Sequence, residues 1–378
     1  MRPRRWAEIA AATAGAAVLG TQAGGQQPSP PATLRKGEMG LVVTGIVGAT
    51  LADGVTTGAA CPKGLSLDPT EIHALSLPPE QRAAHRAQIR GASTWYYADG
   101  DSICQNPSKA GRPDPHYRTL DGVIQAEGMD LDGKAGAIRS GAANRCADGD
   151  FIGADGARNV DHQLLRVVGC NRGYQPGGIG ASGYQGAMHD GEWTLIVKLT
   201  KVDNLSDDAD VDVMIGTSSD PLQRSANGAG RRGATYLLDS NPAWQTTTKG
   251  RIVNGVLTTS PTDLRYHVSV MTGGGRSGRA GQETYFRDAQ LKLNFAPDGT
   301  ATGLLAGYED IETLYRMRYA LDGNADNASF AAEAVGYTCP GIYFSLRRLA
   351  DWRDPATGKC TAISSQYKIT AVPVFVVR

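Results

Sequence analysis

The sequence predicts a mainly β protein: an antiparallel β-sandwich with a loop-rich N-terminal region and a few short helices. Glycine accounts for 48 of the 378 residues, which favours many short elements joined by turns over long helices. From Glu192 onward, apolar and polar residues alternate in short runs, and turn residues interrupt these runs about every 8 to 15 positions. This spacing is typical of an antiparallel sandwich or barrel rather than a parallel α/β sheet, and we expect the sandwich.

The N-terminal 36 residues have the composition of a leader and a linker. Residues 1–23 combine three arginines near the start with the short apolar run Ile9–Gly20 and end on small residues, which predicts an export signal peptide. The general secretory and twin-arginine routes both stay open. Residues 24–36 are rich in proline and glutamine, and we expect a disordered linker there.

The rest of the chain is predicted to form two parts. Residues 37–125 make an N-terminal region of loops and a helix that packs on the sandwich, and residues 126–378 make the β-sandwich domain. Within the first part, Leu41–Thr50 is β-branched and apolar, which predicts a strand. Ser76–Arg90 has two prolines near its start and a glycine just after its end, which predicts a surface helix.

The second part carries most of the predicted strands. Trp193–Thr200 places its tryptophan, leucines and valine on one face, as a half-buried strand requires. Pro373 near the end of the chain indicates that the last strand lies at an edge or a bulge. We expect a glycine-rich loop over 171–191 and helices over Glu309–Ala320 and Ser345–Trp352. The further predicted strands are Val211–Ile215, Thr235–Leu238, Arg251–Leu257, Leu264–Met271, Thr284–Phe295 and Tyr367–Val377.

Cysteine usage agrees with export. The chain has six cysteines, and an even number in an exported chain indicates disulfides. No pair has the CxxC spacing of a zinc or redox motif. The order of the cysteines along the chain favours sequential pairing: Cys61–Cys104, Cys146–Cys170 and Cys339–Cys360.

Two acidic, glycine-containing turns suggest a cation site. Calcium takes six to eight oxygen ligands, and closely spaced aspartate and asparagine side chains supply them. The spacing differs from that of an EF-hand loop, and the alternative is that these residues only form turns. The candidate calcium ligands are Asp130, Asp132, Asp148, Asp150, Asp155, Asn159 and Asp161.

Evidence for catalysis is weaker. Glycoside hydrolysis needs two carboxylates at a defined separation, and the candidates are Glu309, Asp310 and Glu312. Adjacent carboxylates on a strand would point to opposite faces, so exposed surface residues are the alternative. The sequence contains neither a Gly-x-Ser-x-Gly nor a His-Glu-x-x-His motif, so we expect a protein that is not an enzyme.

Aromatic residues near loops suggest carbohydrate binding, because sugar rings stack on exposed aromatic faces; core packing is the alternative. The sandwich pattern is similar in outline to jelly-roll, concanavalin-like lectin folds, and this resemblance is at the level of the fold alone. The candidate stacking residues are Trp95, Tyr96, Tyr97, Tyr174 and Tyr184.

The formal net charge is zero and no basic block occurs, which argues against nucleic acid as a partner. No stretch after the leader approaches 18 apolar residues, so we expect no membrane span. We expect an exported, non-enzymatic module of the periplasm or extracellular space that binds a ligand, a carbohydrate or a cell-surface component, with calcium as its cofactor. The alternatives are a secreted glycan-acting hydrolase and a structural subunit of an extracellular assembly. The ligand and the oligomeric state stay open.

Overall fold

The computed structural model describes residues 36–51, 60–88, 97–122, 124–134, 146–175, 178–189, 191, 193–268, 282–319 and 338–378. The predicted signal peptide and all of the predicted linker except Lys36 lie outside these residues. Residues Pro31–Arg378 cluster into one compact unit. The boundary predicted at residue 125 stays a prediction.

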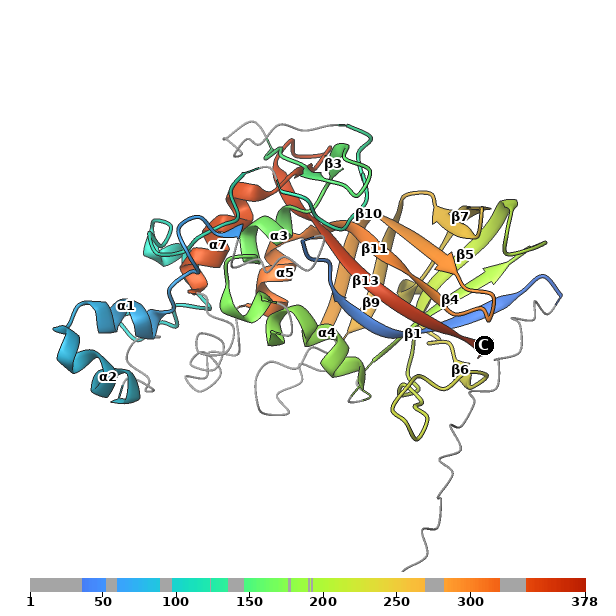
Figure 1. Cartoon of the computed structure of the whole chain (residues 1–378), viewed down its shortest axis with the longest axis horizontal. Helices are drawn as coiled ribbons and strands as arrows, with labels where there is room; N and C mark the ends of the chain where they lie inside the picture. The colour runs from blue at the N-terminus through green and yellow to red at the C-terminus, as the bar shows by residue number, and fades with distance from the viewer. Residues whose placement is uncertain are drawn as a thin grey trace, which may run out of the picture. The chain divides into compact units, whose positions relative to one another are not determined.

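Eight antiparallel strands close into a barrel (Figure 1). The ring closes because β1 pairs with β4 on one side and with β13 on the other, from Gly40 opposite Val374 to Gly48 opposite Tyr367. The predicted sandwich is therefore wrong, since a closed barrel is a single sheet. In ring order the strands are β1 (Met39–Gly48), β4 (Thr194–Thr200), β5 (Asp208–Ser218), β7 (Gln245–Val253), β8 (Val256–Thr259), β10 (Gln282–Phe295), β11 (Ala301–Asp310) and β13 (Cys360–Val377).

The error has a simple physical cause. Alternation shows that each strand has one buried face, and a strand in a sandwich and a strand in a barrel share that property. What separates the two folds is the partner of the first strand. Here that partner is the last strand: Thr44 and Thr370, which bond across the closing pair, are 326 residues apart in the sequence.

The barrel interior is filled by side chains. The alternating residues predicted on the inner face of β4, from Trp193 to Leu199, are buried as expected. Five aromatic rings pack in series inside, with neighbouring ring centroids 5.5 to 6.1 Å apart. Each such buried side chain contributes about 1.5–3 kcal/mol of hydrophobic stabilisation. The five rings are those of Tyr184, Trp193, Tyr266, Phe286 and Tyr367.

Short strands and helices surround the barrel (Figure 1). Strands β6 (Thr235–Leu237) and β12 (Trp352–Arg353) pair with β13, and β9 (Thr262–Val268) pairs with β10. A separate two-stranded sheet holds β2 (Phe151–Ile152) and β3 (Arg158–Val160). The helices are α1 (Pro69–Leu75), α2 (Pro79–Gln88), α3 (Gln163–Val168), α4 (Ile179–His189), α5 (Ile311–Arg318) and α7 (Cys339–Leu349), with 3-10 turns η4 (Pro107–Ala110), η5 (Arg172–Tyr174) and η6 (Pro242–Trp244). Among the described residues, no helix is long and apolar enough to cross a membrane.

Local signals placed some helices correctly and missed others. The predicted helix over Ser76–Arg90 is present as α2. The glycine-rich loop predicted over 171–191 instead contains α4, whose Ala187 and Met188 are buried against the barrel core. Glycine lowers intrinsic helix propensity, and tertiary burial outweighs that preference here. Helix α7 begins earlier than predicted because the Thr338 hydroxyl accepts a hydrogen bond from the Gly341 N–H and caps it.

The three disulfides are Cys61–Cys170, Cys104–Cys339 and Cys146–Cys360, with Cα atoms 5.9, 4.9 and 5.3 Å apart. The predicted sequential pairing, Cys61–Cys104, Cys146–Cys170 and Cys339–Cys360, is therefore wrong in all three bonds. Closing the barrel brings late segments of the chain beside early ones, so spatial neighbours are far apart in sequence. Three disulfides indicate a protein that resides outside the cytoplasm.

Peptide mapping of the unreduced protein tests this pairing. We expect disulfide-linked peptides that join Cys61 to Cys170, Cys104 to Cys339 and Cys146 to Cys360, because these are the sulfur atoms that the fold brings to bonding distance. A linked peptide that joins Cys146 to Cys170 would contradict the barrel arrangement, since each of these residues already has another partner.

Candidate metal centre

A buried glutamine on β13 attaches both predicted acidic turns to the barrel. The Gln366 side chain is fully buried. Its Oε1 accepts a hydrogen bond from the Met129 N–H at 2.7 Å, and its Nε2 donates to the carbonyl oxygens of Met129 at 2.8 Å and Asp161 at 2.6 Å. These three bonds bring together turns that lie about thirty residues apart in sequence, as the 30-residue separation of Leu131 and Asp161 shows.

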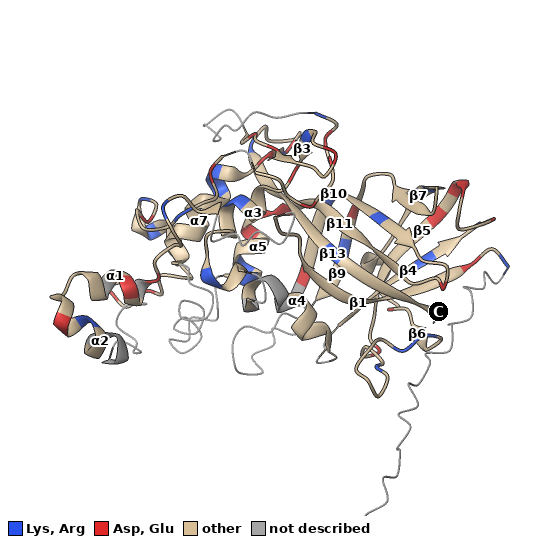
Figure 2. Ribbon diagram, viewed as in Figure 1, with Lys and Arg blue, Asp and Glu red and all other residues tan. Residues whose placement is uncertain are grey.

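Three of the predicted ligands meet at this junction. Asp130, Asp132 and Asp161 each offer a carboxylate oxygen, and these oxygens all lie within 4.8 Å of one another. Backbone N–H groups hold the carboxylates in place: Leu131 donates to Asp161 at 2.6 Å, and Gly133 donates to Asp130 at 2.6 Å. The Asp161 side chain is buried, whereas Asp132 is exposed to solvent. Figure 2 shows acidic residues concentrated in the loops beside β3.

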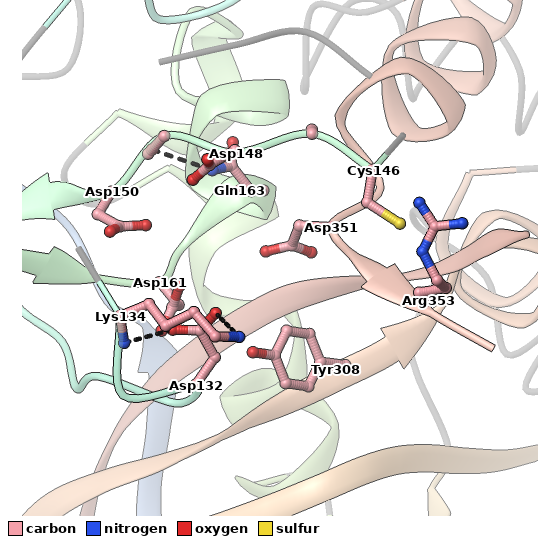
Figure 3. A pocket seen from close by; sticks show the side chains of 12 residues that line it. Asp132, Lys134, Cys146, Asp148, Asp150, Asp161, Gln163, Tyr308, Asp351 and Arg353 are labelled. Atoms are coloured by element: carbon pink, nitrogen blue, oxygen red, sulfur yellow. Dashed lines mark hydrogen bonds and ion pairs between the residues drawn. The ribbon is translucent and has the colours of Figure 1, made fainter. Parts of the chain in front are cut away.

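The junction forms one wall of a pocket of about 310 Å³ (Figure 3). Five aspartates line this pocket, and Asp351 reaches it from the connection between α7 and β12. The Ser364 N–H donates to the Asp351 carboxylate at 2.7 Å. The lining residues are Asp132, Lys134, Cys146, Ala147, Asp148, Gly149, Asp150, Asp161, Gln163, Tyr308, Asp351 and Arg353.

A neutral oxygen ligand also belongs to the lining. Gln163 is 1% exposed, and its Nε2 donates to the Gly149 carbonyl at 3.0 Å, which fixes the orientation of the amide. Its Oε1 is buried and has no hydrogen-bond donor among the described residues. Leaving such an atom without a partner costs about 1–3 kcal/mol of folding free energy. This oxygen is therefore available to a cation or to a hydrogen-bond donor.

The pocket holds two carboxyl groups that resist ionisation. Burial raises the pKa of Asp161 to about 8, and repulsion from Asp351 and Asp150 adds to the effect. Burial likewise raises the pKa of Asp351 to about 7, again with repulsion from Asp150. A bound cation would remove both causes, because it replaces lost hydration and offsets the negative charge.

The other predicted ligands have separate positions. Asp148 and Asp150 line the pocket. Asp155 and Asn159 lie in and beside the β2–β3 turn, outside the lining, where Asp155 is exposed and accepts a hydrogen bond from the Ala157 N–H at 2.9 Å. For Asp155 the turn-forming alternative describes the structure, whereas Asn159 lies in strand β3.

The weak catalytic candidates point to three different places. Glu309 is 3% exposed at one end of the barrel, where its carboxylate accepts a hydrogen bond from the Tyr367 hydroxyl at 2.6 Å and lies 3.6 Å from Arg318. Asp310 caps α5 by accepting from the Thr313 N–H at 2.8 Å. Glu312 forms a surface ion pair with Arg347. Each of the three carboxylates therefore has a different set of protein partners in the structure.

Three of the predicted stacking aromatics lie within the described residues, and each has its own partners there. Tyr184 is buried in the barrel core, and the Tyr174 hydroxyl is hydrogen-bonded to that of Tyr319 at 2.8 Å. The Tyr97 hydroxyl donates to the Asn106 carbonyl at 3.1 Å. Trp95 and Tyr96 lie outside the described residues.

Sequence reasoning missed Asp351, Gln163 and Tyr308, which come to the pocket from separate elements. No local motif surrounds any of them, so only the strand pairings could reveal them. Comparisons of the chain with protein-family models, with curated proteins and with solved structures find no match.

The Glu309 network gives a stability prediction. Replacing Arg318 with alanine leaves a buried carboxylate without its cation, so we expect the free energy of unfolding to fall by about 3–5 kcal/mol. The control is Glu312→Ala, which breaks an exposed ion pair and should cost no more than about 1 kcal/mol. Urea denaturation measures both, and equal losses would show that the Glu309 network is not a buried ion pair.

The raised carboxyl pKa values predict how stability depends on pH. Both groups have folded pKa values above the unfolded value of about 3.9, so the folded state holds more protons between about pH 4 and pH 8. In EDTA, the stability that these two groups contribute should therefore be complete below about pH 4 and should fall steadily as the pH rises to 8, by an amount on the order of a few kcal/mol. Asp161→Asn cannot ionise and should flatten this fall. Urea denaturation at several pH values measures it, and identical pH profiles for variant and wild type would contradict the assignment.

Proposed function

We propose that the protein is an exported, non-enzymatic binding module whose acidic pocket holds Ca²⁺. The observation that carries this proposal is the convergence of the Asp130, Asp132 and Asp161 carboxylates at a pocket whose lining also includes the unsatisfied Gln163 oxygen. Calcium takes six to eight oxygen ligands at 2.3–2.6 Å, and it accepts carboxylate, carboxamide and water oxygens together.

The donor set favours a hard cation over a transition metal. Among the described lining residues there is no histidine, and Cys146 is held in a disulfide. Zinc and copper sites use imidazole and thiolate ligands, which this pocket lacks. Asp130, Asp132 and Asp161 would contact the ion, with Gln163 and Asp351 of the lining completing the shell directly or through water.

The pocket is larger than an ion requires, which supports ligand binding. Its volume of about 310 Å³ lies at the lower end of the range for small-molecule sites. Its lining is polar, and the cationic side chains of Lys134 and Arg353 also belong to it. A carbohydrate or another polar cell-surface component suits such walls better than an apolar ligand. Together with the predicted signal peptide, the disulfides support a location in the periplasm or the extracellular space.

A glycan-acting hydrolase is the second candidate, and one observation favours it. Glycosidases pair a carboxyl group of raised pKa with a second carboxylate, and the pocket holds both kinds of group in Asp161 and Asp150. Release of reducing sugar from a panel of glycans by the wild type, lost in Asp150→Asn, would establish the hydrolase in place of the module. We expect no release.

Thermal unfolding tests the cation site. Calcium should raise the melting temperature of EDTA-treated protein, because a ligand at a hundred times its dissociation constant adds about 2.7 kcal/mol of stability. Asp161→Asn should abolish the increase, since it removes a central ligand. Asp155→Asn is the matched control: it changes the same functional group in the exposed turn and should keep the full increase. A wild-type melt that calcium leaves unchanged refutes the proposal.

A further inference from the structure

Four side chains on the outer face of the barrel form a column of alternating cations and rings. Arg265 on β9 lies opposite Tyr285 on β10, and its guanidinium carbon is 4.8 Å from the centroid of that ring. Arg287, two residues further along β10, is 4.9 Å from the same ring and 4.7 Å from the ring of Trp352. Cations stacked on aromatic faces in this way are fixed in orientation before any partner binds.

Two aspartates hold the rings of this column. The Tyr285 hydroxyl donates to Asp263 at 2.5 Å, and the Trp352 indole N–H donates to Asp288 at 2.8 Å. Asp288 has a left-handed backbone (φ 49°) at an irregularity in β10, which turns its side chain toward the tryptophan. These two carboxylates therefore accept hydrogen bonds from the aromatic side chains rather than from the arginines.

The guanidinium groups keep hydrogen-bonding capacity. Among the described residues, no carboxylate oxygen lies within 4.0 Å of either Arg265 or Arg287. Arg287 is half-buried: its Nε–H is buried and has no acceptor in the described part of the chain, and its terminal Nη1 donates to the Tyr285 hydroxyl at 3.3 Å. Arg265 is exposed. Two preoriented guanidinium groups that have no carboxylate partner in the described part of the chain can pair with carboxylates of a ligand, Arg265 through its exposed N–H groups and Arg287 through its terminal nitrogens.

The column leads to the acidic pocket. Trp352 packs in the same cluster as Tyr308, and Tyr308 lines the pocket. The chain neighbours of Trp352, Asp351 and Arg353, line the pocket as well. Trp352, the last ring of the column, is thus flanked in the chain by two residues of the pocket lining.

We propose that the column binds an acidic polysaccharide, whose uronate carboxylates pair with Arg265 and Arg287 and whose neighbouring sugar enters the pocket. This inference rests on the proposed function only for the sugar in the pocket; the pairing with the arginines stands independently. Alternating carboxylates match two separate cations better than a continuous phosphate backbone does, and a formal net charge of zero gives the chain no overall attraction for nucleic acid.

Calorimetric titration tests the proposal with three probes: a hyaluronan oligosaccharide, a neutral chitin oligosaccharide of equal length and a single-stranded DNA. We expect the full-length protein to bind the hyaluronan oligosaccharide, with an affinity that falls as salt rises. Arg265→Gln and Arg287→Gln should each weaken binding about tenfold to a hundredfold. Arg251→Gln removes the same charge from an exposed site on β7 and should leave the affinity unchanged.

Each outcome separates the column from the calcium site. Equal binding of the acidic and neutral oligosaccharides would refute the proposed role of the column, and so would equal affinity of Arg265→Gln and wild type. Stronger binding of DNA than of hyaluronan would show that the column binds a different polyanion. Because Arg265 is exposed, its variant should fold, and its calcium-induced melting shift should match that of the wild type. If Asp161→Asn loses that shift but still binds the oligosaccharide, the column holds and the pocket takes no part in binding.

Discussion

The pairing of β13 with β1 is the interaction on which the rest of the molecule depends. It closes the barrel, and the same 18-residue strand then continues past β1 to support the acidic pocket. Gln366 binds the two acidic turns, Ser364 accepts a hydrogen bond from the Gln163 N–H at 2.8 Å, and Cys360 is crosslinked to Cys146. A single strand thus supplies both the closure of the fold and the floor of the candidate site.

Two buried polar clusters differ in how completely their members are satisfied. At the barrel end, Glu309 has a hydroxyl donor and a nearby cation, and Arg318 also donates to the Tyr184 hydroxyl at 3.0 Å and stacks on its ring. Buried groups paired in this way keep a defined geometry and need no ligand. In the pocket, like charges face one another and the Gln163 oxygen has no donor in the described part of the chain. Incomplete satisfaction is what distinguishes a candidate binding site from a structural network.

The disulfides reinforce the same arrangement. Cys146–Cys360 joins the rim of the pocket to β13 across 214 residues of sequence, and Cys104–Cys339 joins α7 to the loop region across 235. Crosslinks that close long loops restrict the unfolded chain most in the chain-entropy model. They also hold segments with little regular structure, such as 146–150, against the barrel.

The sequence by itself determined the local features of this protein: the alternating strands, the helix α2, the presence of disulfides and the two acidic turns. Each of these depends on residues within a few positions of one another. The tertiary structure alone decided that the sheet is a barrel, which cysteines pair, and that Asp351 and Gln163 join Asp161. Those outcomes depend on contacts between distant segments, and the pattern of any one segment is compatible with several partners. Glu309 illustrates how far sequence patterns can be used. Its neighbours in sequence suggested a catalytic pair, whereas its neighbours in space, Arg318 and Tyr367, place it in a buried ion-pair network.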